Sequence, residues 1–118
     1  TLTSLSASGS LNDVTIDDGS FVGSSVSIIN GSQIGKHVIL NTASSIDHDT
    51  KISDFSFISP NTSIAGNVKI EENVFVGTGV KIIPNVKIKN GSIIGAGATV
   101  IKDVEANLTV IGTPAKKK

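Results

Sequence analysis

The sequence contains no cysteine, tryptophan, tyrosine or methionine. Without cysteine it can form neither a disulfide framework nor a thiolate metal site, and it has no thiol nucleophile. A reducing, cytoplasmic location fits this composition. It also lacks any apolar run that approaches the roughly 20 residues of a membrane-spanning helix, and it shows no secretory signal sequence. We therefore expect a cytoplasmic protein that has no membrane partner.

Net charge is lacking as well, because 10 lysines and arginines balance 10 aspartates and glutamates over 118 residues. A nucleic-acid partner would require a basic face that neutralises phosphates, so we expect none. The C-terminal segment AKKK is the one basic cluster, and we interpret it as a solvated tail rather than a binding patch. The length is that of a single domain.

A repeat of six residues dominates the chain. Every sixth residue from Ile16 to Val100 is a branched aliphatic residue. The residue two places before each of these is small or is valine, and the residue three places after the aliphatic one is often glycine or asparagine. Glycine and asparagine accept positive φ at low cost, so we expect a turn at each of these places. The fifteen repeating aliphatic residues are Ile16, Val22, Ile28, Ile34, Leu40, Ile46, Ile52, Ile58, Ile64, Ile70, Val76, Ile82, Ile88, Ile94 and Val100.

Each hexad predicts a short strand followed by a corner. Positions two apart in a strand point to the same side, so the small residue and the aliphatic residue both face inward. Three hexads form one triangular coil of 18 residues, and the fifteen hexads form about five coils. The expected fold is all-β, and the pattern itself leaves the hand of the coil open. We expect a repeat over residues 14–105, an irregular N-terminal cap over 1–13, and a short strand with a basic tail over 106–118.

The outward residues of the strands divide the predicted coil into three faces. The polar face, which should meet water, carries Thr15, Gln33, Lys51, Lys69 and Lys87. The apolar face carries Phe21, Ile39, Phe57, Phe75 and Ile93. The mixed face carries Ser27, Ser45, Ser63, Lys81 and Thr99, followed two places later by Ile29, Asp47, Ala65, Ile83 and Ile101.

The apolar face predicts a subunit interface. Five large apolar groups stacked on the surface of a monomer would form an unusual patch. If this face docks against a different surface of a neighbouring copy, a closed ring results, and the triangular coil suggests three subunits. We therefore expect a homotrimer that forms through this face. The alternative is that a further N-terminal part of a longer chain covers it.

His48 is the candidate general base. It lies at a corner, two residues after Ile46, and the same corner of the next coil holds Gly66, which should leave room for a ligand beside the ring. Histidine titrates close to neutral pH, which suits a general base. Asp47 and Asp49 can hold one ring nitrogen in its N–H form. From these residues alone, His48 is either a catalytic base or a polar residue at a turn.

His37 provides an internal comparison for His48. It lacks flanking carboxylates, and we expect it to be an ordinary surface residue. Since the two histidines lie on different corners of the coil, they cannot converge within one subunit, and we expect no metal site.

The segment GKHVILNTASSIDHDTKISDFSFISPNTSIAGNVKI, with the closing GTPAK, carries a resemblance over about residues 30–116. It resembles the hexapeptide-repeat sugar O/N-acetyltransferases of the sialic-acid and bacillosamine type. The resemblance implies a left-handed parallel β-helix that assembles as a homotrimer. It also implies acetyl-CoA as the co-substrate and an amino or hydroxyl group of a nucleotide-linked sugar as the acceptor. The shared motifs correspond to Asn41–Asp49, Ile58–Pro60, Ala65–Ile70 and Gly112–Lys116.

The resemblance also implies roles for individual residues. His48 would take a proton from the acceptor, with Asp49 as its carboxylate partner. The Gly66 N–H would stabilise the oxyanion of the tetrahedral intermediate. Asn41 would reach the site from a neighbouring subunit, and Phe57 stands near the expected acetyl position. CoA would lie between two subunits and pass the small corner residues Gly77, Thr78, Gly95 and Ala96. Lys116 would bind one of its phosphates.

Two departures from the family pattern favour a competing hypothesis. Relatives usually have a histidine in the hexad F-x-H-I-S-P, where this sequence has Phe57. They also carry an N-terminal α/β segment that holds the nucleotide-linked sugar, whereas the repeat begins here after about 13 residues. The competing hypothesis is a non-catalytic or engineered trimeric β-helix scaffold derived from this family, which lacks the sugar-binding N-terminal segment.

Overall fold

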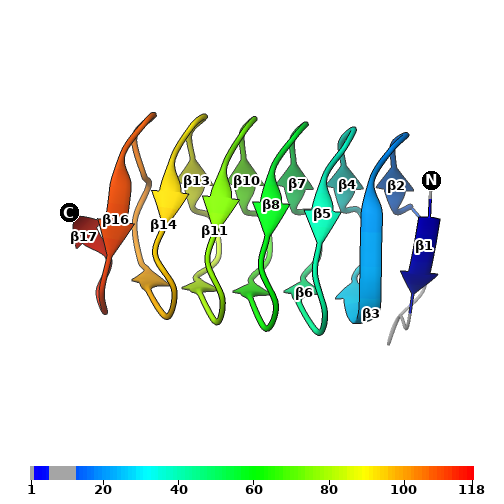
Figure 1. The fold of residues 1–118 in the computed structure, drawn as a ribbon, viewed down its shortest axis with the longest axis horizontal. Coiled ribbons are helices and arrows are strands. Elements are labelled where there is room, and N and C mark those ends of the chain that lie inside the picture. Colours follow the sequence, from blue (N-terminus) through cyan, green and yellow to red (C-terminus); the bar gives the residue numbers. More distant parts are fainter. Residues whose placement is uncertain (1, 6–12) are drawn as a thin grey trace.

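The computed structural model describes residues 2–5 and 13–118, and it shows a parallel β-solenoid (Figure 1). No residue of these two ranges lies in a helix, so none of them forms a helix that could cross a membrane. The strands are β1 (Leu2–Leu5), β2 (Thr15–Ile16), β3 (Phe21–Ile28), β4 (Gln33–Ile34), β5 (Ile39–Leu40), β6 (Ser45–Ile46), β7 (Lys51–Ile52), β8 (Phe57–Ile58), β9 (Ser63–Ile64), β10 (Lys69–Ile70), β11 (Phe75–Val76), β12 (Lys81–Ile82), β13 (Lys87–Ile88), β14 (Ile93–Ile94), β15 (Thr99–Val100), β16 (Thr109–Ile111) and β17 (Lys116–Lys117).

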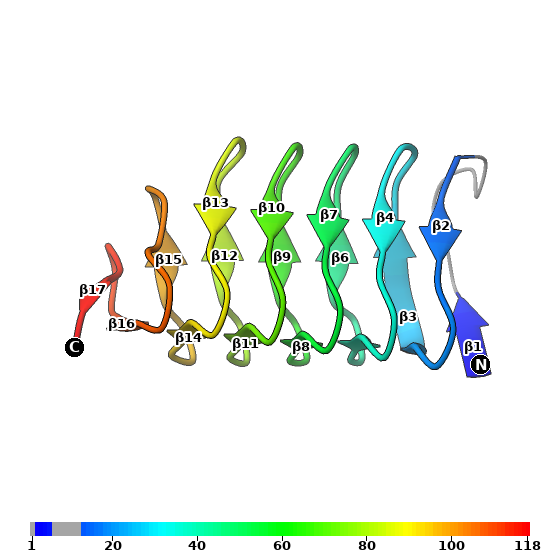
Figure 2. The same cartoon turned by 90° about the horizontal axis from the view of Figure 1, so that it is seen from above.

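Three ladders of strands form the three faces of the solenoid (Figure 2). The polar face contains β2, β4, β7, β10 and β13; the apolar face contains β1, the start of β3, β5, β8, β11, β14, β16 and β17; the mixed face contains the end of β3, β6, β9, β12 and β15. Ile70 pairs with Ile52 on one side and with Ile88 on the other, and the hydrogen bond from Val38 N–H to Ser20 Oγ also spans 18 residues. The predicted winding of three hexads per coil, over about five coils, is confirmed.

The inward positions form one continuous aliphatic core. Every residue of the aliphatic column from Val22 to Val100 is buried, and Ile16 at the N-terminal end is partly buried. The small column from Ser20 to Ala98 is buried as well. Burial of one branched aliphatic side chain stabilises a fold by roughly 1.5–3 kcal/mol, so these stacked columns are the main source of stability.

Serine and threonine in the small column bridge successive coils. The Thr50 hydroxyl donates to Ala65 O at 2.9 Å and accepts from Val68 N–H at 3.4 Å. Ser20 and Ser56 make the same pair of contacts in other coils. Within the described part of the chain, every buried side-chain nitrogen or oxygen has a hydrogen-bond partner. A hydroxyl at this position therefore forms hydrogen bonds with a main-chain carbonyl and a main-chain N–H, which a valine side chain cannot form.

The N-terminal end adds one strand outside the repeat. β1 lies parallel to β3, with Leu2 opposite Phe21 and Thr3 opposite Val22. The predicted N-terminal cap falls largely on residues 1 and 6–12, which lie outside the described residues.

The C-terminal end closes with a shorter coil and a hairpin. Val104 pairs with Ile88, in the place that the repeat of 18 assigns to Ala106. β17 then runs antiparallel to β16. Lys116–Lys117 therefore form a strand where the sequence predicts a tail, because the turn at Gly112 reverses the chain onto β16.

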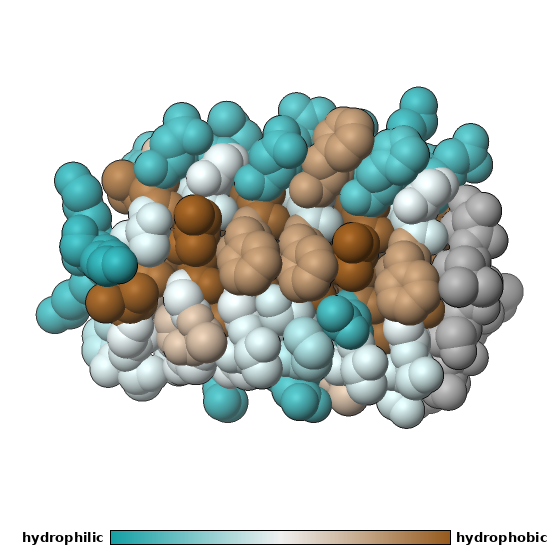
Figure 3. Space-filling model, in the orientation of Figure 1, coloured by the Kyte–Doolittle hydropathy of each residue, from teal (hydrophilic) through white to brown (hydrophobic). Residues whose placement is uncertain are grey.

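The apolar face exposes a row of large side chains, visible in Figure 3 as a brown band along the molecule. Phe21, Phe75 and Ile93 are 38%, 44% and 45% exposed, and Ile39 and Phe57 are half-buried. The rings of Phe57 and Phe75 stack with centroids 5.3 Å apart. The large apolar side chains predicted for this face thus form a continuous row from coil to coil.

Candidate active site

His48 lies at the corner that joins the mixed face to the polar face, which we call the His48 corner. Main-chain hydrogen bonds stack its turns, since Asp49 N–H donates to Asn30 O at 3.1 Å and Asn67 N–H donates to His48 O at 2.9 Å. Asp49 and Asn67 have φ values of 56° and 57°, a left-handed conformation that aspartate and asparagine tolerate. The turns therefore place His48 and Gly66 at the same point of successive coils.

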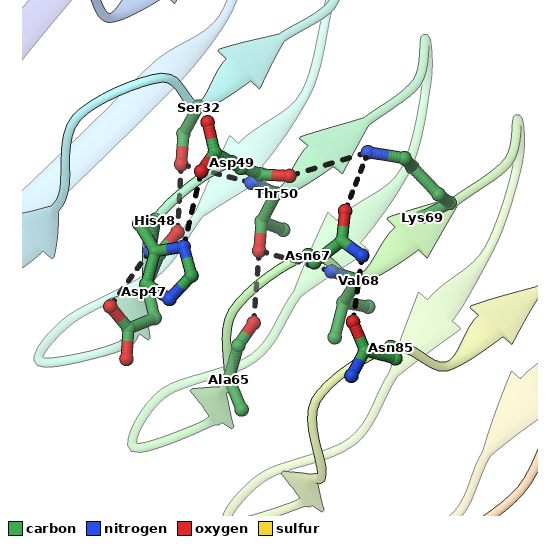
Figure 4. A network of polar contacts seen from close by, with 10 residues as sticks. All are labelled: Ser32, Asp47, His48, Asp49, Thr50, Ala65, Asn67, Val68, Lys69 and Asn85. Carbon is green, nitrogen blue, oxygen red and sulfur yellow. Dashed lines mark hydrogen bonds and ion pairs between the residues drawn. The ribbon is translucent and has the colours of Figure 1, made fainter.

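Polar side chains hold the turn around His48 from inside and outside (Figure 4). The buried Ser32 hydroxyl donates to Asp47 O at 2.8 Å and accepts from Thr50 N–H at 3.3 Å. On the outside, Asp47 Oδ1 accepts from the His48 main-chain N–H at 2.7 Å. The backbone of the turn is thus held independently of the His48 ring.

The His48 ring contacts Asp49 and covers Gly66. Its Nδ1 lies 3.2 Å from Asp49 Oδ2. A Cβ added at Gly66 would lie 2.5 Å from His48 Nε2, and Gly66 is buried. The expectation of open room beside the glycine was wrong, because the imidazole fills that room. Asp49 contacts the ring, whereas the Asp47 carboxylate binds the main chain.

The His48–Asp49 pair is open to solvent in the single chain. Its side chains are 59% and 67% exposed, and an exposed ion pair contributes little to stability. A proton on Nδ1 would be donated to Asp49, which leaves the Nε2 lone pair on the side of Gly66. The arrangement can therefore accept a proton at Nε2.

Shallow grooves flank the His48 corner on both sides. The groove on the mixed face measures about 280 Å³ and is lined by Ser27, Ile29, Ser45, Asp47, Ser63 and Ala65. The groove on the polar face measures about 370 Å³ and is lined by Thr15, Asp17, Gln33, Lys51, Ser53, Asp54 and Glu72. His48 consequently lies on a ridge between two concave surfaces.

Asn41 and Phe57 lie on the apolar face, away from the His48 corner. Asn41 follows β5, and its Oδ1 accepts from Thr42 N–H at 2.8 Å. Phe57 belongs to β8 and stacks on Phe75. One chain alone does not bring these two residues to His48, so a second copy would have to supply them.

The small residues predicted to admit CoA lie at the corner between the apolar and mixed faces. A Cβ added at Gly77 would lie 2.7 Å from Ala96 N, and one added at Gly95 would lie 2.8 Å from Ile111 Cγ2. Contact with the neighbouring coil is therefore enough to explain both glycines, and no ligand is needed to account for them. Thr78 and Ala96 are exposed.

Lys116 is exposed in β17, opposite Ile111 of β16. It lines a groove of about 200 Å³ at the C-terminal end, together with Lys102 and Lys117. Several coils separate it from His48, so a ligand that contacts both must be extended along the solenoid.

His37 contacts aromatic and main-chain groups. Its ring covers Gly19 and stacks on Phe55 with centroids 5.3 Å apart. His37 is exposed, and Phe55 is 57% exposed with φ of 63°. Within residues 13–118, neither histidine joins a group of three His, Cys, Asp or Glu side chains that could hold a metal ion.

The sequence analysis missed a chain of polar contacts beside Asp49 (Figure 4). Lys69 Nζ donates to Asp49 O at 3.3 Å and to Asn67 Oδ1 at 3.4 Å. Asn67 Nδ2 in turn donates to Asn85 Oδ1 at 2.7 Å. The 18-residue spacing that aligns Asp49, Asn67 and Asn85 was the available signal for this row.

The chain is a triangular solenoid of hexads that carries a histidine–aspartate pair on one corner. Residues 49–83 and 67–102 match the family described as bacterial transferase hexapeptide (six repeats). The matched segments lie within the solenoid, so this part of the chain consists of hexapeptide repeats of the kind that the family contains. Among curated protein sequences, none matches it significantly.

Solved acetyltransferase structures share this fold. The acetyltransferase domain of PglB from Neisseria gonorrhoeae FA1090, in complex with acetyl coenzyme A, is 34% identical with a TM-score of 0.94, over 99% of this chain and 57% of that one. PerB from Caulobacter crescentus, in complex with CoA and GDP-perosamine, is 35% identical with a TM-score of 0.88, over 96% and 54%. WeeI from Acinetobacter baumannii AYE is 31% identical with a TM-score of 0.82, over 91% and 56%.

These similarities confirm the predicted resemblance to the sugar O/N-acetyltransferases and the predicted fold, a left-handed parallel β-helix. The chain spans little more than half the length of these solved relatives, between 54% and 57%. The activity, substrates and partners of a whole protein of this kind are therefore treated as a proposal.

Proposed function

We propose that this chain is the catalytic core of a cytoplasmic, acetyl-CoA-dependent acetyltransferase whose acceptor is an amino or hydroxyl group of a nucleotide-linked sugar. Relatives with the same fold bind acetyl coenzyme A, or CoA together with GDP-perosamine. The observation that carries the proposal is the His48 ring, which Asp49 contacts on one side and which lies over Gly66 on the other.

In the proposed mechanism, His48 acts as the general base through Nε2. Asp49 accepts the Nδ1–H, so Nε2 is free to take the proton from the acceptor amine or hydroxyl. The acceptor nitrogen or oxygen then bonds to the thioester carbonyl carbon, whose oxygen becomes an oxyanion. As the C–S bond breaks, CoA leaves as a thiolate and takes the proton from His48. General base catalysis of this kind contributes about 10²–10⁴-fold to the rate.

The Gly66 N–H is suited to stabilise the oxyanion. The coil does not need an N–H at this position of the hexad, because Pro60 and Pro84, which have none, occupy it in other coils. The coil therefore does not require the Gly66 N–H, and an oxyanion would accept from it once the His48 ring moves aside. Since Nε2 lies over the same residue, the proton acceptor and the oxyanion donor would act at one place.

The proposal includes a homotrimer that forms through the apolar face. In one chain the His48 side chain is 59% exposed, and acyl transfer gains from the exclusion of water. A neighbour that docks its apolar face against the His48 corner would cover the site and bring Asn41 and Phe57 to it. The exposed Phe75 and Ile93 would supply apolar contact area.

Acetyl-CoA would enter from the mixed-face side of the ridge. From there its extended arm would follow the corner that carries Gly77, Thr78, Gly95 and Ala96 towards Lys116. Both glycines already contact the next coil closely, so Thr78, Ala96 and Lys116 are the residues of this path whose side chains are free to meet the cofactor.

The second candidate function is a non-catalytic trimeric scaffold that keeps the fold. Phe57 favours it, because an apolar ring stands where the family pattern has a histidine. The scaffold would still trimerise through the apolar face, but it would bind neither acetyl-CoA nor a sugar acceptor.

Binding and turnover of acetyl-CoA separate these two functions. Calorimetry with acetyl-CoA up to millimolar concentration measures binding, and a thiol-reactive dye measures the CoA released when a nucleotide-linked amino sugar is added. The protein contributes no background to the dye assay because it contains no cysteine. Acceptor-dependent release of CoA supports the acetyltransferase. No binding at millimolar acetyl-CoA contradicts it and supports the scaffold.

A further inference from the structure

Three lysines form an in-register row on the polar face. β7, β10 and β13 pair so that Lys69 lies opposite Lys51 on one side and Lys87 on the other, and all three are exposed. Neighbouring strands are about 4.8 Å apart, and like charges directly opposite each other on them are destabilising. The row therefore costs stability unless an anion lies across it.

Asp54 and Glu71, two acidic side chains of the polar face, accept hydrogen bonds from the main chain. Asp54 Oδ1 accepts from Lys36 main-chain N–H at 2.8 Å, at the far corner of the polar face. Glu71 Oε1 accepts from Asn90 main-chain N–H at 3.0 Å. These carboxylates thus cap turns instead of meeting the ammonium groups of the row.

The ammonium groups of the row also lack ion-pair partners among residues 13–118. Asp103 Oδ1 accepts from the main-chain N–H of Lys87, at 2.8 Å, and not from its ammonium group. The ion pairs of this part of the chain are His48–Asp49 and Lys89–Glu105. The positive charge of the row is consequently available to a bound anion.

The row begins beside the candidate active site. Lys51 follows His48 by three residues, and Lys69 follows Gly66 by three. Lys69 Nζ lies 3.3 Å from Asp49 O (Figure 4), next to the residue that holds the His48 ring. An anion on the row would therefore be close enough for a group attached to it to reach the His48 corner.

We propose that Lys51, Lys69 and Lys87 form a binding site for a diphosphate group. Lysine binds phosphate oxygens as a point charge, and a row of three along the solenoid axis matches the extended charge of a diphosphate. Both a nucleotide-linked sugar and CoA carry this group. The position favours the sugar nucleotide, because the polar-face groove that includes Lys51 is also lined by the carboxylates of Asp17, Asp54 and Glu72, which can accept hydrogen bonds from sugar hydroxyls.

The assignment to the acceptor rests on the proposed acetyltransferase function, whereas the binding of a diphosphate does not. The test compares the 118-residue chain with two triple variants of equal net charge. The first is Lys51→Gln/Lys69→Gln/Lys87→Gln. The second, the control, is Lys36→Gln/Lys81→Gln/Lys118→Gln, which removes three exposed lysines outside the row. Calorimetry with inorganic pyrophosphate, GDP and CoA is run on each at low ionic strength.

Removal of the row should weaken pyrophosphate binding about tenfold, which is the combined effect of three exposed charge contacts, and the control should bind as the unmodified chain does. A matching loss for GDP with CoA unchanged assigns the diphosphate to the acceptor, and the reverse assigns it to CoA. The proposal is overturned if the two triple variants bind pyrophosphate equally. Acetyl transfer is measured separately. If the row binds pyrophosphate but the protein transfers no acetyl group, only the proposed acetyltransferase function is contradicted.

Loss of folding does not obscure this test. Since the three charges repel one another, the row variant should unfold at a temperature at least as high as the control variant does. Thermal unfolding followed by circular dichroism measures both. A row variant that unfolds well below the control contradicts the uncompensated repulsion on which the proposal depends.

Discussion

The imidazole of His48 lies over Gly66 of the next coil, so that Nε2 is 2.5 Å from the point where a Cβ would stand. Gly66 therefore matters because it lets a ring approach the main chain, and not because it leaves an empty space. Asp49 fixes the opposite side of the same ring. His48 and Gly66 lie in successive turns, and the hydrogen bond from Asn67 N–H to His48 O holds these two turns in contact.

Replacement of His48 by asparagine tests the general base. His48→Asn keeps a polar side chain but removes the proton acceptor, so kcat should fall by about 10²–10⁴-fold. The melting temperature should stay within experimental error, because the side chain is 59% exposed. His37→Asn is the matched control and should keep full activity. Equal turnover in His48→Asn and the unmodified protein would remove His48 from the mechanism.

Replacement of Gly66 by alanine tests the contact between Gly66 and the ring. The φ of Gly66 lies outside the left-handed region, so the backbone conformation accepts alanine, and the atoms nearest to the added methyl group belong to the His48 ring. We expect at least a tenfold loss of kcat, and a crystal structure with the ring displaced from Asp49.

A double-mutant cycle with His48→Ala separates this contact from other effects of the alanine. Any stability lost in Gly66→Ala, measured by urea denaturation, should return in Gly66→Ala/His48→Ala, because the ring that clashes is gone. An equal loss in both backgrounds would show that the main chain, and not the ring, rejects the methyl group.

Charge on the apolar face tests the subunit interface. Phe57→Lys and Phe75→Lys each place an ammonium group in the row of stacked side chains, and burial of an unpaired charge is strongly unfavourable. Sedimentation velocity at micromolar concentration should show a trimer for the unmodified protein and a monomer for each variant. Thr15→Lys, at an exposed residue of the polar face, should remain trimeric. A monomeric unmodified protein would refute the interface.

Replacement of Thr50 by valine tests the hydroxyl bridges between coils. The change keeps the shape of the side chain but leaves Ala65 O and Val68 N–H without the Thr50 hydroxyl. Loss of partners for buried polar groups should lower the free energy of unfolding by about 1–3 kcal/mol. Thr42→Val, at an exposed corner, should change it by less than about 0.5 kcal/mol. Urea denaturation at one fixed protein concentration measures both, and equal effects would contradict the bridging role.

Much of the fold could be predicted because one short pattern repeats without interruption. Ile52, Ile70 and Ile88 pair as the hexads require, since a slip of one residue would expose an aliphatic residue and bury a polar one. The pattern failed at the C-terminal end, where Val104 and not Ala106 pairs with Ile88. There the repeat no longer constrains the chain, and Val104 takes the inward position beside Ile88.

The sequence by itself determined the winding of the coil, and with it the placement of His48 beside Gly66, because inward and outward positions alternate along every strand and each coil stacks on the one before. Only the tertiary structure decided that Asp49 contacts the ring while Asp47 binds the main chain, and that Lys69 reaches the carbonyl of Asp49. Those choices belong to side-chain rotamers, which depend on the atoms that neighbouring coils place around each corner. A periodic pattern specifies which residues meet, but it does not specify which of their atoms are in contact.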